Sequence, residues 1–108
     1  MPSEVPTKRV LVAEADEIVA FIASHILSRY DFAVVTTTSA AALAHGCDGY
    51  DAVVVSAKLA SEVAGKLDPA RVIVVGDSLD GFKPYARLRK PLELDQLVAT
   101  VTACANRR

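Results

Sequence analysis

Residues 50–59 read YDAVVVSAKL, and the apolar run inside this stretch decides the fold. The run covers residues 52–55, is bounded by polar residues and is rich in β-branched valine. A short run of this kind, without alternation, is typical of a strand that is buried on both faces. Such strands occur in parallel sheets that helices cover on both sides. We therefore expect an α/β protein built around a central parallel strand.

Four further segments, on either side of this stretch, have the composition of strands. They lie at residues 10–13 (VLVA), 33–37 (AVVTT), 72–75 (VIVV) and 86–88 (ARL). All five strands alternate with segments of helical character, so the chain consists of β-α units repeated five times. Right-handed crossovers restrict the topology of such repeats. The sequence therefore favours a doubly wound, five-stranded parallel sheet with strand order 2-1-3-4-5.

The helical segments carry their own boundary signals. Asp16 is a candidate N-cap of a helix that runs to about Tyr30. Ser39 is expected to cap a short Ala-rich helix that ends at Gly46, and a weak helix is expected at about residues 61–67. In the first helix Ile18, Ile22 and Ile26 form one apolar stripe with Phe21 beside it.

The last helix is expected to open at Pro91, because proline suits the first turn of a helix. Its apolar residues recur at helical spacing, as in an amphipathic helix packed on a core. They are Leu94, Leu97, Val98, Val101 and Cys104.

The fourth β-α unit is abnormally short. Only nine residues, 77–85, separate Gly76 from the fifth strand, and they include Gly81 and Pro84. A crossover between parallel strands normally takes a dozen or more residues, most of them helical. We expect the fourth helix to be missing or reduced to a turn.

The composition is that of one globular domain, which we place at residues 8–106 with a disordered or linker segment at 1–7. The chain has 108 residues, of which 52% are hydrophobic and 23% charged. No apolar stretch approaches the roughly 20 residues that span a bilayer, and the N-terminus has no apolar signal region. Cys47 and Cys104 are expected to be free thiols, so we predict a cytoplasmic domain without a membrane partner. A formal net charge of −1 argues against DNA binding.

Ligands of doubly wound sheets sit outside the carboxyl ends of the strands, so the residues there are the candidate site. In this chain these ends carry residues 14–17 (EADE), Ser56, Gly76 with Asp77, and Lys90 with Pro91. The order and spacing of these segments resemble the receiver domains of two-component signalling over residues 8–106. The segment RLRKPLELDQLVATV, at residues 87–101, carries the most specific part of the resemblance, with the Lys-Pro pair of the family at Lys90.

The departures from the family pattern change the expected function. Ser56 stands where the resemblance implies the phosphoacceptor aspartate, and a serine cannot form an acyl phosphate. Ala15 follows Glu14 where the family has an acidic pair, so two carboxylates of the family's Mg²⁺ site are missing. Gly76 replaces the family's Thr or Ser. Of the residues that the resemblance implies for the site, only Lys90 and the acidic residue Glu14 are kept. We expect no metal, no catalysis and a structural role for Lys90.

The missing fourth helix leads to a candidate ligand site. Alternation along the fifth strand predicts that Tyr85, Arg87 and Arg89 share one face, which the absent helix would leave open. Arg71 begins the neighbouring strand. Arginines and a tyrosine suit a planar, anionic ligand, because Arg offers a fork to guanine or phosphate and Tyr a stacking surface. The alternative is that these arginines only keep the sheet edge soluble.

The resemblance favours a ligand, because some receiver-like domains of hybrid histidine kinases bind cyclic di-GMP through arginines. The chain is similar to such pseudo-receivers, which implies a cyclic dinucleotide as ligand and no bound cofactor. The implied partner is the catalytic or dimerisation domain of a histidine kinase, in the same polypeptide.

Two other functions are weighed against ligand sensing. The first is a protein-docking module without a small ligand, which would use the fourth-and-fifth-strand face or the first and last helices. The second is a flavodoxin-like enzyme or flavin carrier. It has little support, because no Gly-rich phosphate loop follows the first strand and the chain has no Trp to stack on a flavin.

Overall fold

A computed structural model describes residues 8–39, 49–63, 67–76, 83–89 and 92–106. Several predicted features lie outside these ranges. They are the N-terminal segment 1–7, the Ala-rich helix after Ser39, Cys47, residues 77–82, Lys90 and the opening proline of the last helix, Pro91.

Five parallel strands form one sheet in the order β2-β1-β3-β4-β5, as predicted. The strands are β1 (Arg9–Ala13), β2 (Ala33–Thr37), β3 (Ala52–Ser56), β4 (Val72–Val75) and β5 (Ala86–Leu88). The three inner strands are apolar throughout their buried length because helices cover both of their faces. Because β1, β3 and β4 are adjacent and parallel, their carboxyl ends lie side by side at one end of the sheet.

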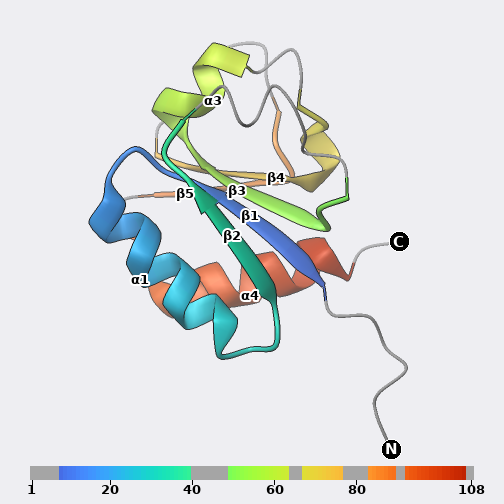
Figure 1. The fold of residues 1–108 in the computed structure, drawn as a ribbon. Coiled ribbons are helices and arrows are strands. Elements are labelled where there is room, and N and C mark those ends of the chain that lie inside the picture. The colour runs from blue at the N-terminus through green and yellow to red at the C-terminus, as the bar shows by residue number, and fades with distance from the viewer. Residues whose placement is uncertain (1–7, 40–48, 64–66, 77–82, 90–91, 107–108) are drawn as a thin grey trace, which may run out of the picture.

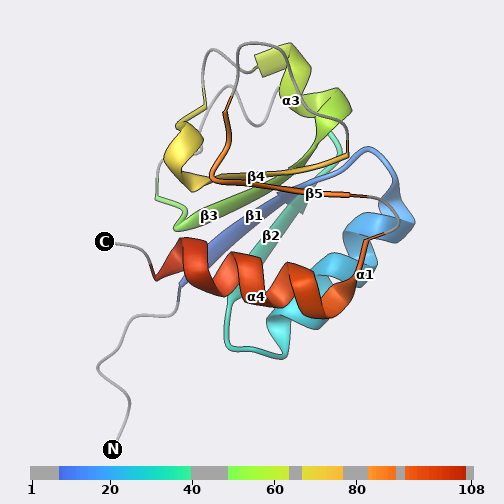
Figure 2. The same cartoon turned by 180° about the vertical axis from the view of Figure 1, so that it is seen from behind.

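Helices cover both faces of this sheet (Figures 1 and 2). Helices α1 (Glu17–Ser28) and α4 (Leu94–Ala105) lie on one face, and α3 (Ala57–Val63) lies on the other. Each face has its own apolar cluster. A 3₁₀ turn, η2 (Pro69–Arg71), leads into β4. Within the described residues no helix is long and apolar enough to cross a membrane.

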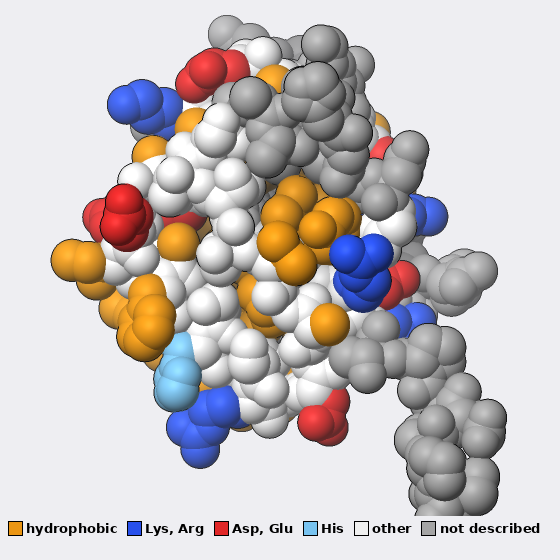
Figure 3. Space-filling view, viewed as in Figure 1, with side chains coloured by type: hydrophobic (Ala, Val, Ile, Leu, Met, Phe, Trp, Pro, Cys, Tyr) orange, Lys and Arg blue, Asp and Glu red, His pale blue; other side chains and the backbone are white. Residues whose placement is uncertain are grey.

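Helix α1 begins where the sequence predicts, and the side that it buries is not the one that carries most of its isoleucines. The Asp16 carboxylate caps it, with Oδ1 accepting from the backbone N–H of Ile18 at 3.0 Å. The residues that α1 buries are Ala20, Ala23 and Leu27. Of the isoleucine stripe noted in the sequence, only Ile26 packs against the core, whereas Ile18 and Ile22 are exposed. Alanines allow α1 to approach the sheet closely, and the larger side chains are left outside (Figure 3).

Helix α3 begins four residues earlier than predicted, directly after β3. It buries Leu59, Ala60 and Val63, which share one side of the helix. Helix α4 buries Leu97, Val101 and Cys104 as predicted.

The connection from β4 to β5 is described only in part. Residues 83–85 contain no helix, in agreement with the prediction of a missing or reduced fourth helix. The Tyr85 N–H donates to the Val72 carbonyl at 2.8 Å, which brings the start of β5 beside the start of β4.

Candidate functional site

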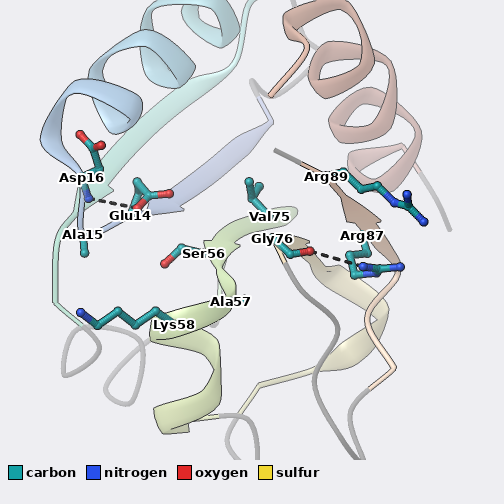
Figure 4. Close-up of a pocket in the computed structure, with 10 residues that line it drawn as sticks. All are labelled: Glu14, Ala15, Asp16, Ser56, Ala57, Lys58, Val75, Gly76, Arg87 and Arg89. Carbon is teal, nitrogen blue, oxygen red and sulfur yellow. Dashed lines mark hydrogen bonds between the residues drawn. The ribbon is translucent and has the colours of Figure 1, made fainter. Parts of the chain in front are cut away.

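A pocket of about 530 Å³ opens at the carboxyl ends of the strands (Figure 4). This is where the topology predicts a ligand site. Both predicted groups of residues contribute to it, the degenerate phosphorylation site and two of the basic residues of β5. The lining residues are Glu14, Ala15, Asp16, Ser56, Ala57, Lys58, Val75, Gly76, Arg87 and Arg89.

Ser56 has a structural role at the start of α3. Its side chain is buried, and its Oγ accepts a hydrogen bond from the backbone N–H of Leu59 at 3.4 Å. This is the bond of a serine N-cap, which satisfies one of the free N–H groups at a helix start. Among the described residues, no base makes a hydrogen bond to this hydroxyl.

Glu14 is buried, and its carboxylate accepts from the backbone N–H of Asp16 at 3.0 Å. Ala15, between them, offers no side-chain oxygen. A Mg²⁺ ion needs several oxygen ligands in octahedral geometry. In the described part of the chain, no group of three or more His, Cys, Asp or Glu side chains is placed to hold a metal ion. The residues at this pocket therefore do not fit the magnesium of the receiver family.

Gly76 is required by the backbone at the floor of the pocket. Its φ of +122° is a conformation that residues with a side chain rarely adopt, and a Cβ atom there would lie 3.3 Å from the Cβ of Ala57. Its N–H donates to the Leu88 carbonyl at 2.8 Å, which fixes β5 beside it. The hydroxyl of the family's Thr or Ser is thus absent, and the local backbone disfavours its return.

Arg87 and Arg89 lie on the β5 side of the pocket and are exposed. The Arg87 Nη1 donates to the Gly76 carbonyl at 3.5 Å. In Figure 4 both side chains lie on the far side of Gly76 from Ser56 and Glu14, and the Arg87 guanidinium faces the Gly76 carbonyl. They are therefore available to a ligand that lies along β5. The fifth residue of the degenerate site, Lys90, lies outside the described ranges.

Arg71 lies at the opposite end of the sheet from this pocket, just before β4. Its Nη1 donates to the Tyr50 carbonyl at 3.1 Å, and its Nε lies 3.7 Å from Asp68 Oδ2. The Arg71 side chain is still 53% exposed. A guanidinium has five N–H donors, so these contacts leave it able to bind an anion.

Tyr85 lies beside Arg71, because its register partner across the sheet is Val72. The prediction that Tyr85 shares an open face with Arg87 and Arg89 is wrong. Tyr85 is half-buried and packs against the apolar cluster on the α1 and α4 side, whereas Arg87 pairs with Val74 of the opposite face. The reason is that β5 begins only at Ala86 and Tyr85 occupies a bend before it, so strand alternation does not extend to Tyr85.

The four predicted ligand residues thus form two pairs along one sheet edge. Arg71 and Tyr85 lie at the amino ends of β4 and β5, and Arg87 and Arg89 lie toward the carboxyl end. Tyr85 and Arg89 are four positions apart in the chain, which spans at most about 14 Å when fully extended. The site also includes Lys58, which sequence reasoning missed. Lys58 could have been found from the sequence, because it comes two residues after Ser56, the last residue of β3.

Comparison with known proteins identifies the fold. No family model and no curated protein matches the chain. Among solved structures, a CheY-like response regulator receiver domain protein from Methanospirillum hungatei JF-1 is 18% identical, with a TM-score of 0.76 over 94% of this chain and 95% of that one. A sensor protein from Polaromonas sp. JS666 is also 18% identical, with a TM-score of 0.73 over 94% and 98%.

The receiver domain of the hybrid histidine kinase CckA is 17% identical, with a TM-score of 0.68 over 91% of this chain and 99% of that one. Identities this low support the fold, while the functional residues of this chain have to be judged individually. The chain has the fold of the response-regulator receiver domains of two-component signalling.

Proposed function

We propose that this chain is a receiver-fold regulatory domain that is not phosphorylated and that binds cyclic di-GMP. The domain itself is not an enzyme. It controls a histidine kinase by engaging or releasing the catalytic or dimerisation domain of the same polypeptide, in the cytoplasm.

The loss of phosphorylation is supported by three positions that have other uses. Ser56 caps α3, and Ala15 supplies no metal ligand. Gly76 adopts a backbone conformation that suits glycine. Replacing one of these residues alone would not rebuild the chemistry, because an acyl phosphate needs the acceptor carboxylate and the metal together.

The ligand site is supported by the distribution of cations along the edge formed by β4 and β5. Arg71, Arg87 and Arg89 are exposed there, and each keeps N–H donors for an anion. Tyr85 lies half-buried beside Arg71, at the amino end of this row. A cyclic dinucleotide has two phosphates and two bases, so it offers partners for both pairs of residues. The Lys83 side chain is exposed next to them and adds positive charge.

The observation that carries the proposal is the exposed pair Arg87 and Arg89, which line the same pocket as Ser56 and Gly76. Calorimetric titration with cyclic di-GMP, cyclic di-AMP and GMP tests it. We expect saturable binding of cyclic di-GMP in preference to the other two. Absence of binding by the unmutated chain would contradict the proposal.

The second candidate is a docking module without a small ligand. It is favoured by the apolar side chains that α1 leaves exposed, among them Ile18 and Phe21 at 71% and 68%. The same titration separates the two candidates, since a pure docking module gives no heat with any cyclic dinucleotide.

A further inference from the structure

Helix α1 carries a strip of apolar side chains that the fold does not cover. Ile18 is 71% exposed, Phe21 is 68% and Ile22 is 44%. They are on the side of α1 opposite to Ala20, Ala23 and Leu27, which pack against the sheet. Figure 3 shows orange side chains gathered over α1 next to a pale-blue histidine. Isolated exposed apolar residues are ordinary, whereas a contiguous patch marks an interaction surface.

The strip is held in place by a ring contact. The rings of Phe21 and His25 stack with centroids 6.0 Å apart and an interplanar angle of 16°. His25 is one turn further along the helix, so the contact keeps the Phe21 ring on the outer side of α1. A pre-ordered aromatic side chain loses little conformational entropy when a partner covers it.

The charges at the two ends of the strip have opposite signs. Glu17 is exposed before Ile18, with the Asp16 cap beside it, and Arg29 is exposed at the C-cap. Twelve residues separate Glu17 from Arg29, or about 18 Å along a helix. A second helix of the same sequence, lying antiparallel, would place its Arg29 near Glu17 and its Glu17 near Arg29. The two apolar strips would then face each other.

We infer that this face of α1 binds a second copy of the chain, in an antiparallel α1–α1 pair with two-fold symmetry. Such an interface is isologous, so each apolar residue and each end charge is used twice. In an antiparallel pair the partly positive N-terminal end of each helix lies beside the partly negative C-terminal end of the other, which is a favourable arrangement of the two helix dipoles. The inference is independent of the proposed ligand, because α1 contributes none of the ligand residues.

The size of the strip predicts a weak pair. The strip exposes three large apolar side chains, whereas a standard interface takes about 20–30 residues from each partner. A stable interface buries about 800 Å² on each partner. We therefore expect self-association of the isolated chain only with a dissociation constant weaker than about 10 µM.

Sedimentation velocity over a concentration series from about 10 µM to about 1 mM measures this association. We expect a concentration-dependent shift from monomer to dimer. Ile22→Ser should weaken the dimer about tenfold or more, because the lost side chain counts in both copies. Val35→Ser is the matched control. Val35 is 43% exposed on β2, and its register partner Leu11 packs on the face of the sheet that α1 does not cover. Equal effects of the two variants, or a monomer at every concentration, would overturn the inference.

Charge exchange tests the antiparallel orientation separately from the apolar contact. Glu17→Arg and Arg29→Glu should each weaken the dimer, because each places like charges at both ends of the pair. The double variant restores opposite charges and should recover the dimer of the unmutated chain. Asp31→Asn, a charge change just beyond α1, should not weaken it. Failure of the double variant to recover association, with its circular dichroism unchanged, would rule out this orientation.

Discussion

At the scale of single residues, Ser56, which stands where the resemblance implies a phosphoacceptor, caps α3. Incubation with acetyl phosphate and Mg²⁺, or with beryllofluoride, should leave the intact mass and the NMR spectrum unchanged. The physical reason is that Ser56 and Ala15 supply neither an acceptor carboxylate nor enough metal ligands. A stable phospho-adduct or a beryllofluoride complex would contradict this prediction. Ser56→Ala should instead lower the free energy of unfolding by about 0.5–1 kcal/mol, through loss of the α3 cap.

Gly76 is the residue at which we expect the largest backbone effect. Gly76→Ala forces a side chain into a φ of +122° with a contact of 3.3 Å to the Ala57 Cβ. It should destabilise the protein by about 1–3 kcal/mol in urea unfolding. Lys58→Ala, a change in the same pocket at an exposed helical position, is the control and should alter stability by less than about 0.5 kcal/mol. An unchanged midpoint for Gly76→Ala would mean that the backbone adapts there.

The residues of the proposed ligand site make a further prediction. Arg71→Ala, Arg87→Ala and Arg89→Ala should each weaken cyclic di-GMP binding roughly tenfold, since a charge-assisted hydrogen bond contributes about 1.5 kcal/mol or more. Tyr85→Ala should weaken it too, by an amount that depends on whether a base stacks on the accessible part of the ring. Arg29→Ala, an exposed arginine on α1, is the control.

Titration calorimetry gives the affinities, and circular dichroism checks the folding of each variant. This check matters most for Arg71, which also bonds the Tyr50 carbonyl. If Arg87→Ala and Arg89→Ala bind normally while Arg71→Ala does not, the ligand occupies only the amino end of the edge. Normal affinity in every variant would place the site elsewhere.

At the scale of elements, the strands and most of the buried side of α4 could be predicted from the sequence, whereas the buried side of α1 could not. The runs at 52–55 and 72–75 are short, apolar and β-branched, and both became central strands. In α1 the buried side consists of Ala20, Ala23 and Leu27, and a search for large apolar side chains passes over the two alanines. Small residues allow α1 to pack close to the sheet. The distance between a helix and a sheet is a property of the folded chain and cannot be read from the sequence of the helix.

The same limit applies to the candidate site. Its location at the carboxyl ends of the strands followed from the topology, and Ser56, Gly76, Arg87 and Arg89 are all found there. The position of Tyr85 did not follow, because the residue at which β5 begins decides whether alternation applies. A three-residue strand gives too few side chains to define its own period.

At the scale of the whole molecule, ligand binding should appear as thermal stabilisation. A ligand that binds only the folded state adds about 2.7 kcal/mol at a concentration of 100 times its dissociation constant. For a chain of 108 residues, this corresponds to a rise in Tm on the order of 10 °C. We expect such a rise in calorimetric melting with cyclic di-GMP and none with GMP at the same concentration.

Variants at the proposed ligand residues and at Ser56 should change this thermal response in different ways. Arg87→Ala and Arg89→Ala should largely keep the Tm of the free protein and lose most of the rise, because both side chains are exposed and the hydrogen bond from Arg87 to the Gly76 carbonyl is long, at 3.5 Å. Ser56→Ala should lower the Tm of the free protein and keep the full rise, since its hydroxyl caps α3 and no ligand residue depends on it. A rise that survives in the arginine variants would mean that these side chains do not hold the ligand, and a rise that vanishes in Ser56→Ala would place the ligand beside Ser56.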